Sequence, residues 1–167
     1  MYTYIMGEHT MNNYMLRLST TISKEALFDF YFDSVYQTIW QLRQEYPGFR
    51  NWYYNIVRPG MLIGKREIIL SIVNDYIAGV LVLKNNHDER KICTLRVCSN
   101  FQRNGIGKSL ISKSFEFLDT EKPLITVNAA KENQFNKIFN HFGFEKTFEL
   151  SGHYRQHEKE IVYNELL

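Results

Sequence analysis

The segment with the clearest chemical potential is a glycine-containing loop, Gln102-Arg103-Asn104-Gly105-Ile106-Gly107-Lys108, between an apolar strand-like run and an amphipathic helical run. Its two glycines permit backbone conformations and close approaches that side chains forbid. Successive amides at such a turn, where a helix begins, attract anionic oxygens, and the helix dipole adds partial positive charge. Arg103 and Lys108 add Coulomb attraction at the rim. The loop is therefore predicted to bind a phosphate or pyrophosphate group.

Two familiar phosphate-binding motifs fit this loop poorly. Gly107-Lys108-Ser109 is similar to the end of a P-loop, but that motif needs a glycine at position 102, where the chain has glutamine. No aspartate ends the strand predicted at Leu124–Val127, where it would help to hold magnesium. A dinucleotide-binding loop needs a third glycine at position 110, which is Leu110. Nucleotide hydrolysis and dinucleotide binding are both disfavoured, and a glycine-rich turn without a ligand is the plain alternative.

A third interpretation fits the residues better. Leu95-Arg96-Val97, followed after a short gap by Gln102-x-x-Gly105-x-Gly107, resembles the acyl-CoA signature of the GNAT superfamily of N-acyltransferases, whose loop reads Q/R-x-x-G-x-G/A. Members of that family typically continue with a strand and a helix that ends in an aromatic-x-x-x-G-F pattern. Here that pattern is Phe139 to Phe144. The resemblance spans roughly Tyr14 to Leu166, and only the loop and the Gly143-Phe144 ending are specific.

The resemblance implies an acyl-CoA-dependent N-acyltransferase that uses acetyl-CoA as the acyl donor and a primary amine as the acceptor. A strand-like pantetheine arm would hydrogen-bond the backbone of the strand before the loop, and the loop amides would hold the pyrophosphate. A backbone amide near Val97 could polarise the thioester carbonyl, and the amine would attack it directly. The implied cofactor-binding residues are Leu95, Val97, Gln102, Arg103, Asn104, Gly105, Ile106, Gly107 and Lys108.

Two positions depart from the family pattern. Many members have a tyrosine four residues before the glycine of the G-F pair, where it protonates the leaving thiolate, but this chain has Phe139. Some members carry a glutamate base four residues before the Leu95 position, and here that residue is Lys91. These losses favour an alternative function, a catalytically degenerate CoA-binding regulatory or interaction module.

A loop between the last two predicted strands offers replacement groups. Tyr154 is the predicted catalytic residue, a hydroxyl that could protonate the thiolate. His153 and His157 titrate near neutrality and could act as bases, although a solvated loop with incidental histidines is the plain alternative. Water chains can also remove the proton of a primary amine. Cys98 is disfavoured as an acyl-carrying nucleophile, because the sequence positions no histidine to activate it.

The first elements that must position these groups follow from hydrophobic periodicity. A strand is predicted at Tyr14–Thr20, and Ser23 is the expected N-cap of a long helix. The apolar stripe of that helix consists of Leu27, Phe30, Tyr31, Val35, Ile39, Leu42 and Tyr46. A shorter helix is predicted from Phe49 to Val57, ending before an Arg58-Pro59-Gly60 turn.

The remaining chain alternates strands and helices. Strands are predicted at Glu67–Val73, Ile77–Leu83, Lys91–Cys98, Leu124–Val127, Glu145–Leu150 and Glu160–Glu165, with a hairpin turn at Asn74-Asp75. A helix at Gly107–Leu118 is predicted to bury Leu110, Ile111, Ser114, Phe117 and Leu118, and a helix at Gln134–Phe142 is predicted to end at Gly143. The resulting order, β-α-α-β-β-β-α-β-α-β-β, predicts an α/β (α+β) fold. With the resemblance, this is a GNAT-like mixed, mostly antiparallel sheet of about seven strands flanked by about four helices and splayed at the acyl-CoA site.

The composition fits one globular domain. The chain has 167 residues, 44% apolar and 23% charged, and its 12 Phe, 11 Tyr and 2 Trp predict a bulky core. Twenty basic and 18 acidic residues are too balanced for a nucleic-acid surface. No apolar run approaches the ~18 residues of a membrane span, and a signal-peptide pattern is missing, so a cytoplasmic location is expected. Cys93 and Cys98 are poor partners for each other and do not make a zinc site, so no metal is expected.

One boundary is predicted near the start of the chain. Residues 1–12 are expected to form a loose extension and residues 13–167 a single N-acyltransferase domain, because no repeat or linker divides them. The expected partner is a small-molecule or protein amine, with no strong nucleic-acid signal and no membrane, and a homodimer is left open. A small amine, an amino sugar, a protein N-terminus and an RNA-linked aminoacyl group are all open as acceptors.

Overall fold

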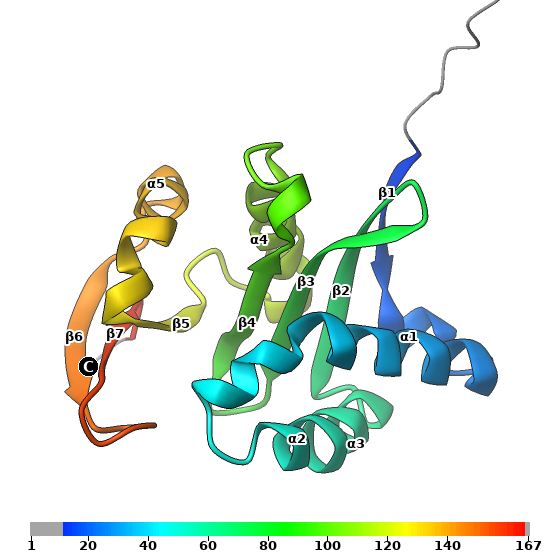
Figure 1. Cartoon of the computed structure of the whole chain (residues 1–167), viewed down its shortest axis with the longest axis horizontal. Helices are drawn as coiled ribbons and strands as arrows, with labels where there is room; N and C mark the ends of the chain where they lie inside the picture. Colours follow the sequence, from blue (N-terminus) through cyan, green and yellow to red (C-terminus); the bar gives the residue numbers. More distant parts are fainter. Residues whose placement is uncertain (1–11, 166–167) are drawn as a thin grey trace, which may run out of the picture.

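A seven-stranded mixed sheet lies at the centre of the computed structural model, which describes residues 12–165 (Figure 1). Its strand order is β1-β2-β3-β4-β5-β7-β6, and every neighbouring pair is antiparallel except β4 and β5. The strands are β1 (Asn13–Arg17), β2 (Arg66–Val73), β3 (Tyr76–Asn85), β4 (Arg90–Val97), β5 (Leu124–Asn128), β6 (Lys146–Ser151) and β7 (Lys159–Tyr163). The predicted mixed sheet is confirmed. The proposed N-terminal extension lies, except for Asn12, outside the described residues.

The parallel neighbours β4 and β5 pair only over their first residues. The register joins Lys91 to Leu124 and Ile92 to Ile125, and no pairing continues beyond Ile92. Along its other edge β5 pairs with β7 from Ile125 to Asn128. The two strands therefore diverge along most of β4, and Figure 1 shows β5, β7 and β6 at the left, apart from β1–β4.

Helices cover both faces of the sheet. The α1 face carries α1, α2 and α3, which pack on alternate residues of β2 and β3, and the opposite face carries α4 and α5. Figure 1 shows α4 and α5 grouped away from α1–α3. The helices are α1 (Glu25–Ile39), α2 (Phe49–Trp52), α3 (Arg58–Leu62), α4 (Ile106–Leu118) and α5 (Glu132–Phe142).

Aromatic side chains fill the core of the α1 face. The rings of Phe32 and Tyr53 stack with their centroids 4.3 Å apart, and the Tyr53 hydroxyl donates to the Phe32 carbonyl oxygen at 2.7 Å. Tyr36 and Phe49 pack around them. Since a buried tyrosine needs a partner for its hydroxyl, this bond allows Tyr53 to be fully buried. The expected bulky core accounts for these aromatics.

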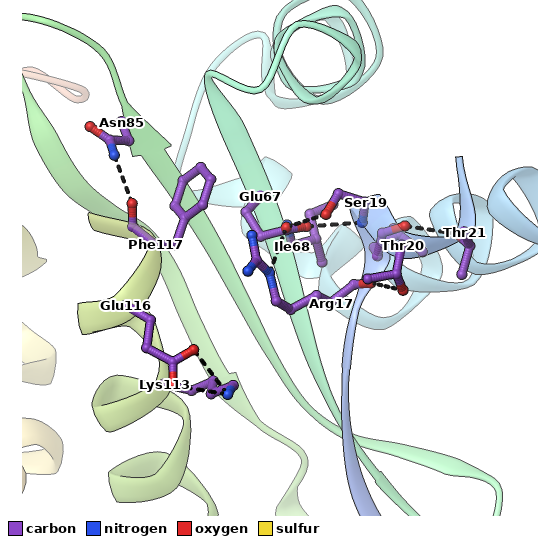
Figure 2. Close-up of polar contacts among 11 residues, drawn as sticks. Arg17, Ser19, Thr20, Thr21, Glu67, Ile68, Asn85, Lys113, Glu116 and Phe117 are labelled. Atoms are coloured by element: carbon purple, nitrogen blue, oxygen red, sulfur yellow. Dashed lines mark hydrogen bonds and ion pairs between the residues drawn. The ribbon is translucent and has the colours of Figure 1, made fainter. Parts of the chain in front are cut away.

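The first strand is shorter than predicted, because a buried carboxylate turns the chain. β1 ends at Arg17, and a 3₁₀ turn, η1 (Leu18–Thr21), follows. Glu67 of β2 is fully buried and accepts hydrogen bonds from Arg17 Nε at 3.1 Å and from the Ser19 amide at 3.0 Å. Figure 2 shows Arg17 and Ser19 directed at Glu67. Such side-chain to backbone bonds compete with strand pairing, so the prediction of Tyr14–Thr20 was wrong at its end.

The predicted face of the first helix was wrong in part. Leu27 and Phe30 are 39% and 65% exposed. The buried residues of α1 are Phe28, Phe32, Val35, Tyr36 and Ile39. The predicted apolar stripe and the observed buried face both contain Val35 and Ile39 at helical spacing. Only packing against β2 and β3 therefore decides which of the two faces is buried. The N-cap is Lys24 rather than Ser23, and it makes no side-chain capping bond.

The predicted turn at Arg58-Pro59-Gly60 is helical instead. A π-helical stretch, η3 (Tyr53–Val57), leads from α2 directly into α3, and Pro59 lies in the first turn of α3. Proline is tolerated there, because its missing N–H would have no intrahelical acceptor. The helical segment ends near Gly64, which has φ +73° and donates to the Met61 carbonyl oxygen.

The other predicted elements are confirmed in type, with ends that differ by one or two residues. The hairpin turn has Asn74 at φ 48° and Asp75 at φ 66°, the left-handed values that a two-residue hairpin turn favours. Gly143 ends α5 at φ 64°, as a C′ glycine does. On α4 the predicted inner face is buried except for Phe117, which is half-buried.

Candidate functional site

The glycine-containing loop connects the end of β4 to α4 through a 3₁₀ turn, η4 (Ser99–Phe101). Its backbone reaches the left-handed region twice, at Arg103 with φ 65° and at Gly105 with φ 75°. The Gln102 side chain donates to the Val97 carbonyl oxygen at 3.1 Å, and the Ser109 amide donates to Gly105 at 3.0 Å. Hydrogen bonds thus connect the loop to both β4 and α4.

The first amides of α4 are the N–H groups that the sequence predicts to bind an anion. Ile106, Gly107 and Lys108 are the first helical residues, so their N–H groups have no acceptor within the helix. Gly105 is exposed, and an added Cβ there would meet nothing within 4 Å. Gly107 is buried, and its Cβ would come within 2.8 Å of Ile138 in α5. Gly105 therefore sets the turn, whereas Gly107 allows close packing of α4 and α5.

The backbone of β4 faces the divergence at the predicted pantetheine positions. The Cys98 amide donates to Ala78 of β3 at 2.8 Å, in a register where Val97 lies opposite Gly79 and Leu95 opposite Leu81. In an antiparallel pair the hydrogen-bonded residues alternate, so Leu95 and Val97 direct their N–H and C=O groups away from β3. That edge is the one that β5 leaves after Ile92. An extended ligand can add there as a strand would.

Arg96 lies between those two residues and faces the α1 face. It pairs with Val80, which belongs to the core of that face. Its Nη2 donates to Gln41 in a 3₁₀ turn, η2 (Trp40–Gln44), at 3.1 Å. Within residues 12–165 its buried Nε has no hydrogen-bond partner.

Glu160 is a site residue that sequence reasoning missed. It lies on β7, opposite Asn128 of β5, and is 2% exposed. Ile161 and Tyr163 belong to the core under α4 and α5, so by alternation Glu160 faces the α1 face. Burial, followed by the nearby carboxylates of Glu158 and Glu45, raises the pKa of this carboxyl to about 7. Its sequence context, a charged residue in the last strand, gives no signal of burial.

Tyr154, the predicted catalytic residue, is half-buried in the loop between β6 and β7. Its ring meets the ring of Tyr46 edge-on, with centroids 4.8 Å apart. Burial raises the pKa of Tyr46, and Glu160 is the strongest nearby charge on it. The structure thus brings Tyr154, Tyr46 and Glu160 together on the α1 face. His153 packs edge-on against Tyr154, but His153 and His157 are both exposed.

The positions that depart from the family pattern lie elsewhere. Phe139 is 1% exposed in the core under α4 and α5, where its ring contacts Phe135, Phe144 and Tyr163. Cys93 and Cys98 are free thiols. Burial raises the pKa of the Cys98 thiol, which lowers its thiolate population and opposes a role as nucleophile.

Neither a cluster of metal-ligating side chains nor a membrane-spanning helix occurs in the described part of the chain. Residues 12–165 contain no group of three or more His, Cys, Asp and Glu side chains that could hold a metal ion. Among the same residues, no helix has both the length and the apolar character needed to cross a membrane.

The family assignment comes from the sequence. The profile of the acetyltransferase (GNAT) domain matches residues 45–155, which include β4, the loop and α5. The chain therefore belongs to the GNAT acetyltransferase family. No functionally curated protein matches the chain.

Solved structures confirm the fold. A protein of Desulfovibrio desulfuricans assigned to the GNAT acetyltransferases has a TM-score of 0.62, at 12% identity over 91% of this chain and 97% of its own. A protein of Bacillus anthracis described as a streptothricin acetyltransferase, in complex with acetyl coenzyme A, has a TM-score of 0.56, at 17% identity over 65% and 67%. The ribosomal-protein-S18-alanine N-acetyltransferase of Escherichia coli has a TM-score of 0.52, at 17% identity over 59% and 67%. The last two matches span about two thirds of each relative.

Proposed function

We propose that the protein is an N-acetyltransferase that transfers the acetyl group of acetyl-CoA to a primary amine by direct attack. The observation that carries this proposal is the open edge of β4. There the backbone groups of Leu95 and Val97 face the divergence from β5, immediately before a loop that opens α4. The similar fold of a structure that holds acetyl coenzyme A supports the choice of donor.

Different segments of the chain would bind different parts of acetyl-CoA. The amides from Arg103 to Lys108 would hold the pyrophosphate at the start of α4, with Lys108 and Arg103 at the rim. The strand edge at Leu95 and Val97 would hold the pantetheine arm. The Val97 N–H faces the divergence and is the donor that would bind the thioester oxygen, whereas the Val97 carbonyl oxygen accepts from the Gln102 side chain. Acetyl-CoA itself supplies the activated thioester.

Tyr154 is the proposed proton donor to the leaving thiolate. Its place beside Tyr46 on the α1 face supports this role, because the acceptor must approach the thioester from the face that α4 and α5 leave open. Phe139 is buried among other rings and has no proton to give. Neither histidine of the loop is needed for this step.

A second candidate, a CoA-binding module without catalysis, is favoured by the apolar Phe139 and the lysine at position 91. Two measurements separate the candidates. Calorimetry with acetyl-CoA tests binding, and release of free thiol with a panel of primary amines tests transfer. Tight binding with no thiol release from any amine would favour the module, and no binding would overturn both functions.

A further inference from the structure

Burial of the Glu160 carboxyl is energetically unfavourable for the folded protein, and no contact within the described fold accounts for it. Its side chain is 2% exposed, and in the described part of the chain its Oε2 has no hydrogen-bond partner. An ionised carboxylate in such a place is unfavourable unless something binds to it. Among residues 12–165 the other buried side-chain atom without a partner is Arg96 Nε, which faces the same side of the sheet. Buried polar groups without partners are rare in folded proteins, and a catalytic role is one of the reasons for which they are retained.

The position of Glu160 along the sheet matches the proposed thioester position. β4 and β5 run parallel from the pair Lys91 and Leu124. Beyond that pairing β4 continues through Leu95 to Val97, and β5 continues to Asn128, which pairs with Glu160. Glu160 therefore lies across the divergence from the stretch of β4 whose backbone faces that opening.

The groups around Glu160 leave its charge uncompensated. Lys131 is already paired with Glu45. The Glu158 carboxylate accepts a hydrogen bond from the Asn128 amide at 2.8 Å and lies 3.6 Å from the Arg155 guanidinium. Tyr46 offers a phenol rather than a cation. The titratable and charged groups that face Glu160 are Glu45 and Tyr46 after η2, Lys91 of β4, Lys131 beside β5, and Glu158 of the loop before β7. Glu160 Oε2 has no hydrogen-bond partner among residues 12–165, so its carboxylate can attract a positively charged acceptor.

We propose that Glu160 is the general base that takes a proton from the acceptor amine, in place of the glutamate that this chain lacks at Lys91. This inference rests on the proposed N-acetyltransferase function. Because Oε2 is covered, one bridging water would carry the proton. The acceptor would be a primary amine that arrives as a cation.

Acetyl transfer exchanges the C–S bond of the thioester for a C–N bond, and proton transfers accompany this exchange. The ammonium passes one proton to the Glu160 carboxylate, and its nitrogen lone pair forms a bond to the thioester carbonyl carbon. The C–S bond breaks as the tetrahedral intermediate collapses, and the thiolate takes a proton from Tyr154. The nitrogen loses a second proton to solvent, solvent returns a proton to the Tyr154 phenolate, and Glu160 releases its proton to solvent. The net products are an amide, free CoA thiol and one proton.

The ionisation of Glu160 suits this role. Its pKa near 7 results first from burial and then from Glu158 and Glu45. A base is most effective when its pKa lies near the working pH, because it is then ionised and still accepts a proton well. The charge of Glu158 thus tunes the base without taking part in the proton transfer.

The test compares Glu160→Gln with Glu158→Gln, using one amine acceptor and thiol release across pH. We expect Glu160→Gln to lower kcat/KM by ~10²–10⁴-fold and to remove the rise of activity near pH 7. Acetyl-CoA affinity should stay within about two-fold, since the carboxylate does not contact the loop. Glu158→Gln should stay active, with that rise shifted to lower pH, because a charge that raises the pKa of Glu160 is gone.

Each contrary result has a distinct meaning. Wild-type protein that releases no thiol with any amine overturns the proposed function and this inference with it. Active wild type with an equally active Glu160→Gln overturns the inference alone. A Glu160→Gln protein that loses activity together with its unfolding midpoint and acetyl-CoA affinity shows a structural role, and this also overturns the inference.

Discussion

The two sides of the point where β4 and β5 diverge are built in different ways. The side under α4 comes from one continuous segment, residues 91–108, and it offers mainly backbone groups. The α1 face collects side chains from segments far apart in the chain, with Tyr46, Arg96, Tyr154 and Glu160 as its main members. Backbone groups can hold the same donor whatever the acceptor is. The side chains of the α1 face are free to differ with the acceptor.

The two sides also differ in how well their polar side-chain atoms are satisfied. On the loop side Gln102 bonds to Val97, and Asn104 donates to the Phe101 carbonyl oxygen at 3.3 Å. On the α1 face Arg96 and Glu160 each keep a buried atom without a partner in the described residues. Local rules are violated most often at functional sites, where the cost is offset elsewhere in the fold. These differences support the proposal that side chains of the α1 face carry out the chemistry and that the loop anchors the acyl donor.

The largest effect is expected at Tyr154. Tyr154→Phe removes only a hydroxyl, so the packing on Tyr46 should survive. If this hydroxyl protonates the thiolate, kcat should fall by ~10²–10⁴-fold, as for the loss of a general acid. Thiol release at saturating acetyl-CoA measures it. His153→Ala, an exposed neighbour, is the control and should stay within a few-fold of wild type. A Tyr154→Phe protein with near-normal turnover would make water the proton donor.

A second prediction concerns stability against pH. Glu160 has an ordinary carboxyl pKa of 4.5 when unfolded and about 7 in the folded protein. The folded protein then binds the proton more tightly, so this residue lowers the free energy of unfolding as pH rises from 4.5 to 7. At 1.36 kcal/mol per pKa unit the loss reaches about 3 kcal/mol.

Denaturant unfolding of wild type and Glu160→Gln at pH 4.5 and pH 8 measures this effect. Because glutamine has no charge to bury, the variant should gain stability relative to wild type at the higher pH. If the free energies of unfolding of the two proteins changed equally between these pH values, Glu160 would not be the group that titrates.

A smaller effect is expected on the loop side. Gly105→Val forces a β-branched residue into a left-handed turn, and it should weaken acetyl-CoA binding at least ~10-fold, since the amides of the turn must move. Gly64→Val is a matched control, because Gly64 has φ +73° against +75° for Gly105 and neither Cβ would meet any atom within 4 Å. Both variants should lose about 1–2 kcal/mol of stability.

Calorimetry with acetyl-CoA then separates the two glycine variants. Equal affinities in Gly105→Val and Gly64→Val would remove the loop from the binding site. Gly107→Val is a poorer test, because it would also displace Ile138 of α5.

The smallest effect is expected from Phe139→Tyr. Phe139 is buried among Phe135, Phe144 and Tyr163, so a hydroxyl there should cost about 1–3 kcal/mol in unfolding free energy while turnover changes by less than a few-fold. Phe135→Tyr, on a half-buried ring of the same helix, should cost less. A strong rise in turnover would instead mean that the new hydroxyl reaches the thiolate.

Several features of this protein follow from sequence alone, because each depends on residues close together in the chain. The loop that opens α4 can be predicted from Gly105 and Gly107, and the hairpin turn from Asn74-Asp75. The alternation of strands and helices gives the order of elements, which the fold confirms except for the additional helix α3. In each case backbone conformation is set by local sterics, and a short motif carries the information.

Tertiary structure decided the rest. Which stripe of α1 is buried depends on packing against β2 and β3, since Phe28 and Phe30 are equally apolar. Arg58-Pro59-Gly60 is helical because the preceding π-helical stretch runs directly into it. Glu160 and Tyr46 come together only when β7 pairs with β5 and η2 folds over the α1 face. Burial and proximity, which turn an ordinary glutamate into a base near pKa 7, are properties of the packed molecule and have no local signature in the chain.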